Sequence, residues 1–329
     1  METTRHRRPS LPPSDPNSSS DPYSKTDKKS SDGGSDDATT AAALAGSCRC
    51  WHDEKKVGHL WSFHGAKERL RLVKAELVVD GSFDEAVDGV DGVFHTACPQ
   101  ANIKEVMMEP AIRGTMNVLN ACAKARSVKR LVLTSTCAAI RYHEDADMIS
   151  PLNESHWSDT DYCRKYNLWY AYAKTLAEKE AWRLAKEHNT DLVVVHPSFV
   201  VGPLITPQPT STLQFLLSVM KGPSIPNLTL GFVHIDDVVS AHMIAMEDSR
   251  ASGRLICSSS VAHWSEIIEM IRSKYPSYQL PTMCNEMQRD NNPHSMDTKK
   301  IKELGLQAFK TIPQMFDDCI KSFQEKGFL

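Results

Sequence analysis

The sequence contains no long hydrophobic run and no dominant sign of charge. No apolar stretch in its 329 residues reaches the roughly 20 residues that a membrane-spanning helix needs, and the N-terminus has no signal-peptide core. The formal net charge is −3, which gives no sign of the basic surface typical of nucleic-acid-binding proteins. We therefore expect neither a membrane span nor a nucleic-acid partner.

Closely spaced cysteines are also scarce. The nine cysteines are scattered apart from Cys48 and Cys50, and one residue between two cysteines fits neither a zinc knuckle nor a redox motif. We interpret them as reduced thiols of a cytoplasmic protein and predict no metal site.

A glycine-rich turn between a buried strand and a helix is the third absence. Gly33, Gly34 and Gly46 stand in residues 1–46, a segment rich in Ser, Asp, Thr and Pro. Such a segment buries too little apolar surface to offset the entropy lost on ordering. We predict that residues 1–46 are a disordered low-complexity segment.

Beyond this segment, apolar strands alternate with helices. Strands are expected at 70–79, 92–97, 130–135 and 191–195, with helices at 109–125 and 166–188. Continuous apolar strands of this kind indicate a parallel sheet covered by helices on both faces. The predicted fold is α/β, with a Rossmann-type doubly wound parallel sheet.

Tyr170 and Lys174 stand four residues apart in a stretch with helical periodicity, so they share one helix face. A free tyrosine has a pKa of about 10, and a neighbouring ammonium group favours the phenolate and lowers that pKa. Such a pair suits the protonation of a ketone oxygen while a cofactor delivers hydride to the carbon. The alternative is an ordinary surface pair on an amphipathic helix.

Three strand ends carry groups that suit a bound cofactor. Ligands of open parallel sheets bind beyond the carboxyl ends of the strands. Thr96, Thr136 and Pro197 follow or end three of the expected strands. Tyr170 lies on the helix between the second and third of these strands, so we expect it to face the same crevice.

These residues and the stretches around them resemble the extended short-chain dehydrogenase/reductase family, in the branch of cinnamoyl-CoA and dihydroflavonol reductases. The matching stretches include 81–87, 89–97, 131–135, 153–159, 199–203 and 231–238. Within this branch the chain is most similar to the plant tetraketide α-pyrone reductases. The resemblance covers all of the chain except its N-terminal segment.

The resemblance implies catalytic roles for four residues. Tyr170 would donate the proton, and Lys174 would lower its pKa and hold the nicotinamide ribose. Thr136 stands where the family usually has a serine and would orient the substrate carbonyl. Asn117 matches an asparagine that can support a proton relay, although packing of its helix is an equal alternative.

On the cofactor side, the resemblance implies NADP. Arg49 aligns with an arginine that binds the 2′-phosphate and Lys56 with a nearby lysine, and both favour NADP over NAD. Glu76 and Leu77 align with residues on the adenine side. The further implied contacts, with Tyr170 and Lys174, are Thr96, Pro197, Val200 and Thr212.

The resemblance also implies how the chain is divided. We expect an incomplete dinucleotide-binding domain at 47–196, which lacks its first βα unit. A smaller, mostly helical and mainly substrate-binding region follows at 197–329, and residues 232–248 return to the cofactor domain.

The expected function is NADP-dependent reduction of a ketone on a small molecule. A polyketide-derived α-pyrone is the first substrate class, and phenylpropanoid-type compounds such as cinnamoyl-CoA and dihydroflavonols are the second. A different class of function is a non-catalytic binding protein without cofactor on the same scaffold.

The missing glycine-rich unit has a structural cost, because the first strand of a doubly wound sheet lies at its centre. Without it, neighbouring strands lose a hydrogen-bonding partner and expose an edge. Two explanations are open. In the first, an aberrant gene model or splice form has replaced the N-terminus that the family usually has, and the intact catalytic residues favour this explanation. In the second, the chain is a degenerate relative that no longer binds NADP.

Overall fold

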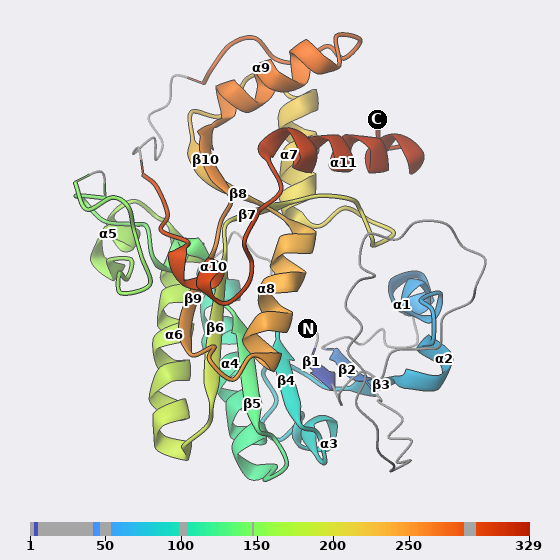
Figure 1. The fold of residues 1–329 in the computed structure, drawn as a ribbon, viewed down its shortest axis with the longest axis vertical. Coiled ribbons are helices and arrows are strands. Elements are labelled where there is room, and N and C mark those ends of the chain that lie inside the picture. Colours follow the sequence, from blue (N-terminus) through green and yellow to red (C-terminus); the bar gives the residue numbers. More distant parts are fainter. Residues whose placement is uncertain (1–2, 6–41, 47–53, 99–103, 147, 286–293) are drawn as a thin grey trace, which may run out of the picture.

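A seven-stranded sheet forms the base of the computed structural model, which describes residues 3–5, 42–46, 54–98, 104–146, 148–285 and 294–329. The strand order is β3-β2-β1-β4-β5-β6-β9 (Figure 1). The strands are β1 (Thr3–Arg5), β2 (Ala42–Gly46), β3 (Leu70–Lys74), β4 (Gly92–His95), β5 (Arg130–Thr134), β6 (Leu192–Pro197) and β9 (Gly253–Cys257). Neighbouring strands run parallel, except in the two pairs that β1 makes.

Alternate side chains of the central strands point into two different apolar layers, as the pleat of a strand requires. Leu131 and Leu133 of β5 pack with residues of α4 (Lys104–Lys124) and α6 (Trp169–His188). Val132 packs with residues of α8 (Ile235–Glu247) instead. Helices therefore cover both faces, and the prediction of a doubly wound α/β sheet is confirmed.

The structure differs from the predicted disorder of residues 1–46 at two short strands. β2 pairs with β3 in parallel along its whole length. β1 lies antiparallel between β2 and β4, opposite residues 93–95. It stands where the first strand stands in the order 3-2-1-4-5-6, so β4 keeps a partner on that side, contrary to our expectation. Residues 6–41 lie outside the described residues.

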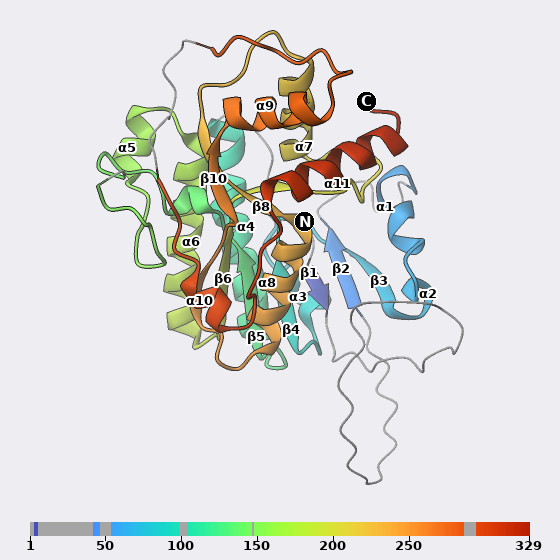
Figure 2. The ribbon, with the colours of Figure 1, turned by 45° about the horizontal axis from the view of Figure 1, so that its top comes forward.

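A second lobe sits beyond the sheet and is built around three strands that we did not predict (Figure 2). They are β7 (Phe199–Val201), β8 (Thr229–His234) and β10 (Ser260–His263), in the order β10-β8-β7. Helices α7 (Ser211–Lys221), α9 (Trp264–Lys274) and α11 (Ile312–Glu325) pack on them. Trp264 is fully buried at the centre, with its ring centroid 5.5 to 6.4 Å from those of Phe199, Phe215, Phe232 and Phe316.

The helix expected at 166–188 is shorter than predicted. A separate helix, α5 (Thr160–Lys165), precedes it, and Asn167 between them has a φ of 57°, which breaks the helical path. Tyr170 therefore lies in the first turn of α6. The remaining short helices are α1 (Glu54–Trp61), α2 (Ala66–Arg69), α3 (Asp84–Val87), α10 (Lys299–Glu303) and the 3-10 turn η1 (Cys137–Ala139).

The sequence predicted no membrane span and reduced cysteines. Within the part of the chain that the structure describes, no helix combines the length and apolar character needed to cross a membrane. The seven cysteines in that part are all free thiols, and Cys48 and Cys50 lie outside it. The predicted domain boundaries remain predictions, although α8 packs on the large sheet and β9 is one of its edge strands.

Gly114 of α4 marks the closest approach of that helix to Leu77. A Cβ at Gly114 would lie 2.1 Å from Leu77 Cδ1. Alanine favours a helix over glycine by about 1 kcal/mol, but overpacking costs about 1–3 kcal/mol, and Leu77 is buried. We expect Gly114→Ala to lower the free energy of unfolding by about 1–2 kcal/mol in urea titrations.

The control for this prediction is the variant that removes the clash. Leu77→Ala opens the space that the new methyl group needs. The double variant should therefore lose less stability than the sum of the two single variants, because the residues are in contact. Strictly additive losses would contradict the packing argument.

Candidate active site at the strand ends

The first turns of α6 meet the carboxyl end of β5 at Tyr170 and Lys174. The Thr136 side chain lies beside the Tyr170 hydroxyl, close enough to lower its pKa. Lys174 is buried, and its Nζ donates to the Thr134 carbonyl oxygen at 2.9 Å. The structure thus brings the predicted phenol, ammonium group and alcohol to one strand end.

Thr136 is held in place by the turn that follows β5. Its backbone is extended, with φ −163° and ψ 151°, and it forms the N-cap of η1. Thr136 Oγ1 accepts a hydrogen bond from the Ala138 N–H at 3.2 Å. This cap fixes the hydroxyl beside Tyr170.

The pKa of Tyr170 moves in the direction opposite to our expectation. Burial raises it above its ordinary value, with Cys98 and Tyr142 acting in the same direction, while the neighbouring Thr136 side chain lowers it. The Lys174 cation, whose Nζ donates to the Thr134 carbonyl oxygen, does not outweigh this rise. Since 44% of Tyr170 is exposed, solvent moderates the effect of burial.

A buried carboxylate one turn beyond Lys174 escaped the sequence prediction. Glu178 is 1% exposed. Its four hydrogen-bond donors are Ser135 Oγ at 2.6 Å, Arg254 Nε at 2.7 Å, His196 Nε2 at 2.8 Å and Trp182 Nε1 at 3.4 Å. Because a carboxylate only accepts, the bonded His196 nitrogen carries the proton.

The charge of Glu178 is stabilised by these partners. Burial acts to raise its pKa, but His196, Arg254 and Ser135 outweigh burial and lower the pKa to about 2. A signal was present in the sequence, since Glu178 shares a helix face with Ala171, Ala181 and other small buried residues. A charged residue on such a face needs a buried partner.

Asn117, proposed as a relay residue, lies with the predicted adenine-side residues instead. Its Nδ2 donates to the Leu77 carbonyl oxygen at 3.0 Å. Among the described residues, it has no hydrogen bond with Tyr170 or Lys174. Neighbouring Glu76 is half-buried, with its carboxylate 3.9 Å from Lys74 Nζ.

The other predicted cofactor contacts are distributed around the strand ends. They are Thr96 beyond β4, Pro197 at the end of β6, Val200 in β7 and Thr212 in the first turn of α7. Thr96 is exposed and Pro197 is buried. Arg49 lies outside the described residues, as does the side chain of Lys56, whose backbone belongs to α1.

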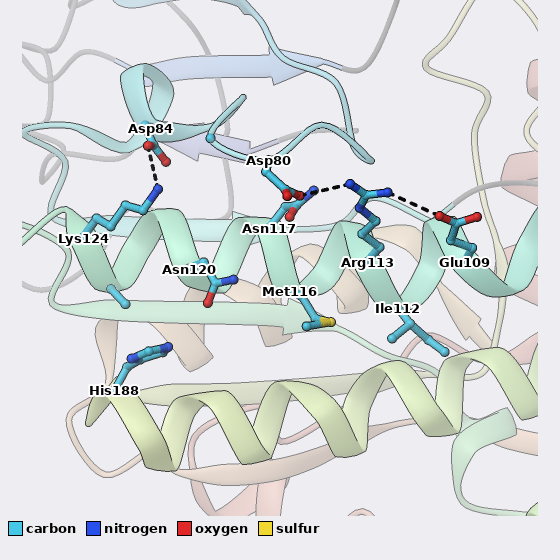
Figure 3. A pocket seen from close by; sticks show the side chains of 12 residues that line it. Asp80, Asp84, Glu109, Ile112, Arg113, Met116, Asn117, Asn120, Lys124 and His188 are labelled. Atoms are coloured by element: carbon cyan, nitrogen blue, oxygen red, sulfur yellow. Dashed lines mark hydrogen bonds and ion pairs between the residues drawn. The ribbon is translucent and has the colours of Figure 1, made fainter.

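A hollow of about 780 Å³ lies along α4 but contains none of Thr136, Tyr170 and Lys174. Figure 3 shows its charged side chains paired with one another. Arg113 lies 3.4 Å from both Asp80 and Glu109, and Lys124 lies 2.9 Å from Asp84. Because these cations are already paired, we place the active site at the strand ends.

The strand-end site fits the nicotinamide end of a dinucleotide. The Lys174 ammonium group has three donors, of which one binds Thr134. His95 Nδ1 is buried at the end of β4 and has no hydrogen-bond partner among the described residues. Burial, aided by Lys174, lowers the pKa of His95 to about 3, so this imidazole is neutral. Because Thr115 Oγ1 donates to the Ala111 carbonyl oxygen, His95 Nε2 donates to Thr115 and Nδ1 is left as an acceptor.

The chain belongs to the NAD dependent epimerase/dehydratase family, which its residues 38–256 match. It is 62% identical to tetraketide alpha-pyrone reductase 2 of Arabidopsis thaliana over 285 residues, which are 84% of this chain and 89% of that protein. It is 40% identical to cinnamoyl-CoA reductase 1 of Petunia hybrida over 280 residues, 84% of each protein. The predicted class, a reductase of the short-chain dehydrogenase/reductase type, is confirmed.

Solved structures agree with this assignment. Vestitone reductase from alfalfa superposes with a TM-score of 0.71 at 31% identity, covering 84% of this chain and 89% of that one. A yeast methylglyoxal/isovaleraldehyde reductase complexed with NADPH gives a TM-score of 0.73 at 23% identity, covering 87% and 92%. At that identity the second likeness shows the fold alone.

The Glu178 network should make the protein sensitive to acid. A carboxylate whose pKa falls from 4.5 to about 2 on folding contributes stability above pH 4.5, and this contribution disappears as the pH falls toward 2. It amounts to an order of 3 kcal/mol. We expect the free energy of unfolding, measured in urea, to fall by about this amount over that range.

Two variants separate this network from surface charge. Glu178→Gln should lack most of the acid dependence and should lose about 3–5 kcal/mol at neutral pH, because Arg254 stays buried without its counter-charge. Glu187→Gln, on the exposed side of the same helix, should change stability by less than about 1 kcal/mol. Equal losses in the two variants would contradict the assignment.

Proposed function

We propose that this chain is an NADP-dependent reductase that converts a ketone of a small molecule to an alcohol. The observation that carries the proposal is the approach of the Thr136 side chain to the Tyr170 phenol beside buried Lys174, at the carboxyl end of a central parallel strand. A polyketide-derived α-pyrone is the substrate class favoured by the 62% identity to a tetraketide alpha-pyrone reductase. Phenylpropanoid-type substrates are second, from the cinnamoyl-CoA reductase relatives.

Residues of the chain would transfer the proton to the substrate. When bound, the reduced nicotinamide supplies a hydride to the carbonyl carbon. The Tyr170 O–H bond breaks as its proton passes to the carbonyl oxygen, which completes the alcohol and leaves a phenolate. The raised pKa of Tyr170 keeps the phenol protonated at neutral pH, and the Thr136 hydroxyl holds the carbonyl oxygen beside it.

Lys174 would act after the proton has moved. Its ammonium group lies one helical turn from Tyr170, where a cation stabilises the phenolate that transfer produces. The two donors that Thr134 does not use are available to the nicotinamide ribose. Asn117 would support this site through Leu77, whose carbonyl it holds, and not as a relay.

NADP is proposed as the cofactor on the positive charge of Arg49 and Lys56, which suits a 2′-phosphate. Glu76 and Leu77 would lie beside the adenine, and Thr96, Pro197, Val200 and Thr212 along the rest of the cofactor. The cytoplasmic location inferred from the scattered cysteines stays a prediction.

Removing the proton donor should abolish the proposed reaction. In an assay that follows NADPH consumption with an α-pyrone ketone, we expect Tyr170→Phe to lower kcat by about 10²–10⁴-fold. Thr136→Ala should lower kcat by about 10²-fold, because it removes one hydrogen-bond donor to the developing oxyanion. Thr136→Ser keeps the hydroxyl and should stay within about threefold of wild type. Full activity of Tyr170→Phe would refute the role of the phenol as proton donor.

A non-catalytic binding protein is the second candidate, and the direction of β1 favours it. Thr3 pairs with His95 and Arg5 with Val93, so the chain leaves β1 at the amino end of β4. Thr96 and Thr136 stand at the opposite, carboxyl edge. A phosphate-binding turn that followed β1 in this direction would lie on the wrong edge of the sheet.

Titration calorimetry with NADPH separates the two candidates. A reductase should bind with a Kd of roughly 1–100 μM, a range of −8 to −5 kcal/mol, and NADH should bind at least about tenfold more weakly. No heat at about 1 mM NADPH would favour the binding protein. Lys174→Met provides the control, since it removes the proposed ribose contact and should weaken binding.

A further inference from the structure

Three successive turns of α6 contact three successive residues at the end of β5. The residues on the helix are Tyr170, Lys174 and Glu178, which share one face at a spacing of four. Lys174 binds the backbone of Thr134, and Glu178 binds the side chain of Ser135. The remaining residue, Thr136, carries the hydroxyl that meets Tyr170.

The two oxygens of Glu178 have different partners. Oε2 accepts from Ser135 and from His196 of β6. Oε1 accepts from Arg254 of β9 and, at the longer distance of 3.4 Å, from Trp182 on the same helix. The Ser135 bond therefore connects Glu178 to the residue before Thr136, whereas the Trp182 bond is made on the side away from the site.

Arg254 holds the carboxylate from the other side. Its guanidinium carbon lies 3.9 Å from the centre of the Trp157 ring, and Nη1 donates to the carbonyl oxygens of Glu154 and His156. A planar guanidinium held at several points has little freedom to move. Glu178 is thus a fixed point to which the Ser135 hydroxyl is bonded.

We propose that Glu178 is a positioning residue, which acts through the Ser135 hydroxyl to set the place of Thr136 against Tyr170. Ser135 is the residue directly before Thr136, so a shift of its backbone displaces the Thr136 hydroxyl. The role of Thr136 and Tyr170 as the catalytic pair rests on the proposed function, whereas the position of Thr136 beside Tyr170 does not.

The interaction of Thr136 with the Tyr170 phenol can be followed without cofactor or substrate. In protein labelled with ¹³Cζ-tyrosine, the Tyr170 signal, assigned with Tyr170→Phe, reports on hydrogen bonding to the phenol. Thr136→Val removes the partner and provides the reference shift. We expect Ser135→Ala to move the signal in the same direction as Thr136→Val, and Ser135→Thr, which keeps the hydroxyl, to restore the wild-type position.

Trp182→Phe is the matched control. It removes a donor to the same carboxylate on the side away from the site, so it should lower stability without moving the Tyr170 signal. An unchanged signal in Ser135→Ala would overturn the proposal. The same holds for a signal that moves equally in Trp182→Phe, or for one that Thr136→Val leaves in place.

Kinetics provide a second readout that a purely structural role would not give. If the chain reduces ketones, Ser135→Ala should lower kcat by about three- to tenfold, because small misplacements of catalytic groups cost up to about 10²-fold. KM should stay within about twofold, since binding contacts are untouched. A rise in KM with kcat unchanged would overturn the proposal. A wild-type chain without reductase activity would remove the proposed function and leave the spectroscopic result decisive.

Discussion

The hydrogen-bonded ion pair between Glu178 and Arg254 is the interaction on which the arrangement of the site depends. Each ion loses several kcal/mol of hydration on burial, and the attraction of the other offsets this loss. Apolar side chains of equal volume often stabilise a core as well or better, so net stability does not explain the pair. Its distinctive effect is geometric, because donors on β5, β6 and β9 converge on one carboxylate of α6. The helix that carries Tyr170 and Lys174 thereby has one position on the sheet.

The features of this arrangement that show as patterns over a few residues could be predicted from the sequence. The continuous apolar strands and the spacing of Tyr170 and Lys174 predicted the sheet and the shared helix face. The partners of Glu178 could not be predicted, because Arg254 lies 76 residues away along the chain and periodicity shows a face without showing what it meets. The direction of the Tyr170 pKa was missed for a related reason, since burial depends on the whole fold. The three-stranded sheet was missed because its strands are short and the segment between β7 and β8 contains several prolines.

The two ends of the proposed cofactor site depend on different parts of the chain. The nicotinamide end is built from β4, β5, β6 and α6, which form a continuous parallel core with buried side chains. The phosphate end of such sites depends on the turn after the first strand of the order 3-2-1-4-5-6, and in this sheet β1 stands at that position and runs against its neighbours. The hydrogen bonds of β1 complete the sheet although it runs antiparallel to both neighbours. A strand at that position can therefore complete the sheet without providing a phosphate-binding turn.

Because these two properties are separate, a change at the N-terminus would affect cofactor binding before it affected proton transfer. Contacts with the phosphates are equally strong before and during hydride transfer, so their loss weakens cofactor binding without altering the barrier of the bound complex. In the described part of the chain, the helix of the proposed proton donor and the Thr136 hydroxyl are held by hydrogen bonds of α6 and η1, not of β1. A chain of this kind retains the groups for carbonyl protonation while its affinity for a dinucleotide varies. Intact catalytic residues therefore do not by themselves imply cofactor binding, and the two must be measured separately.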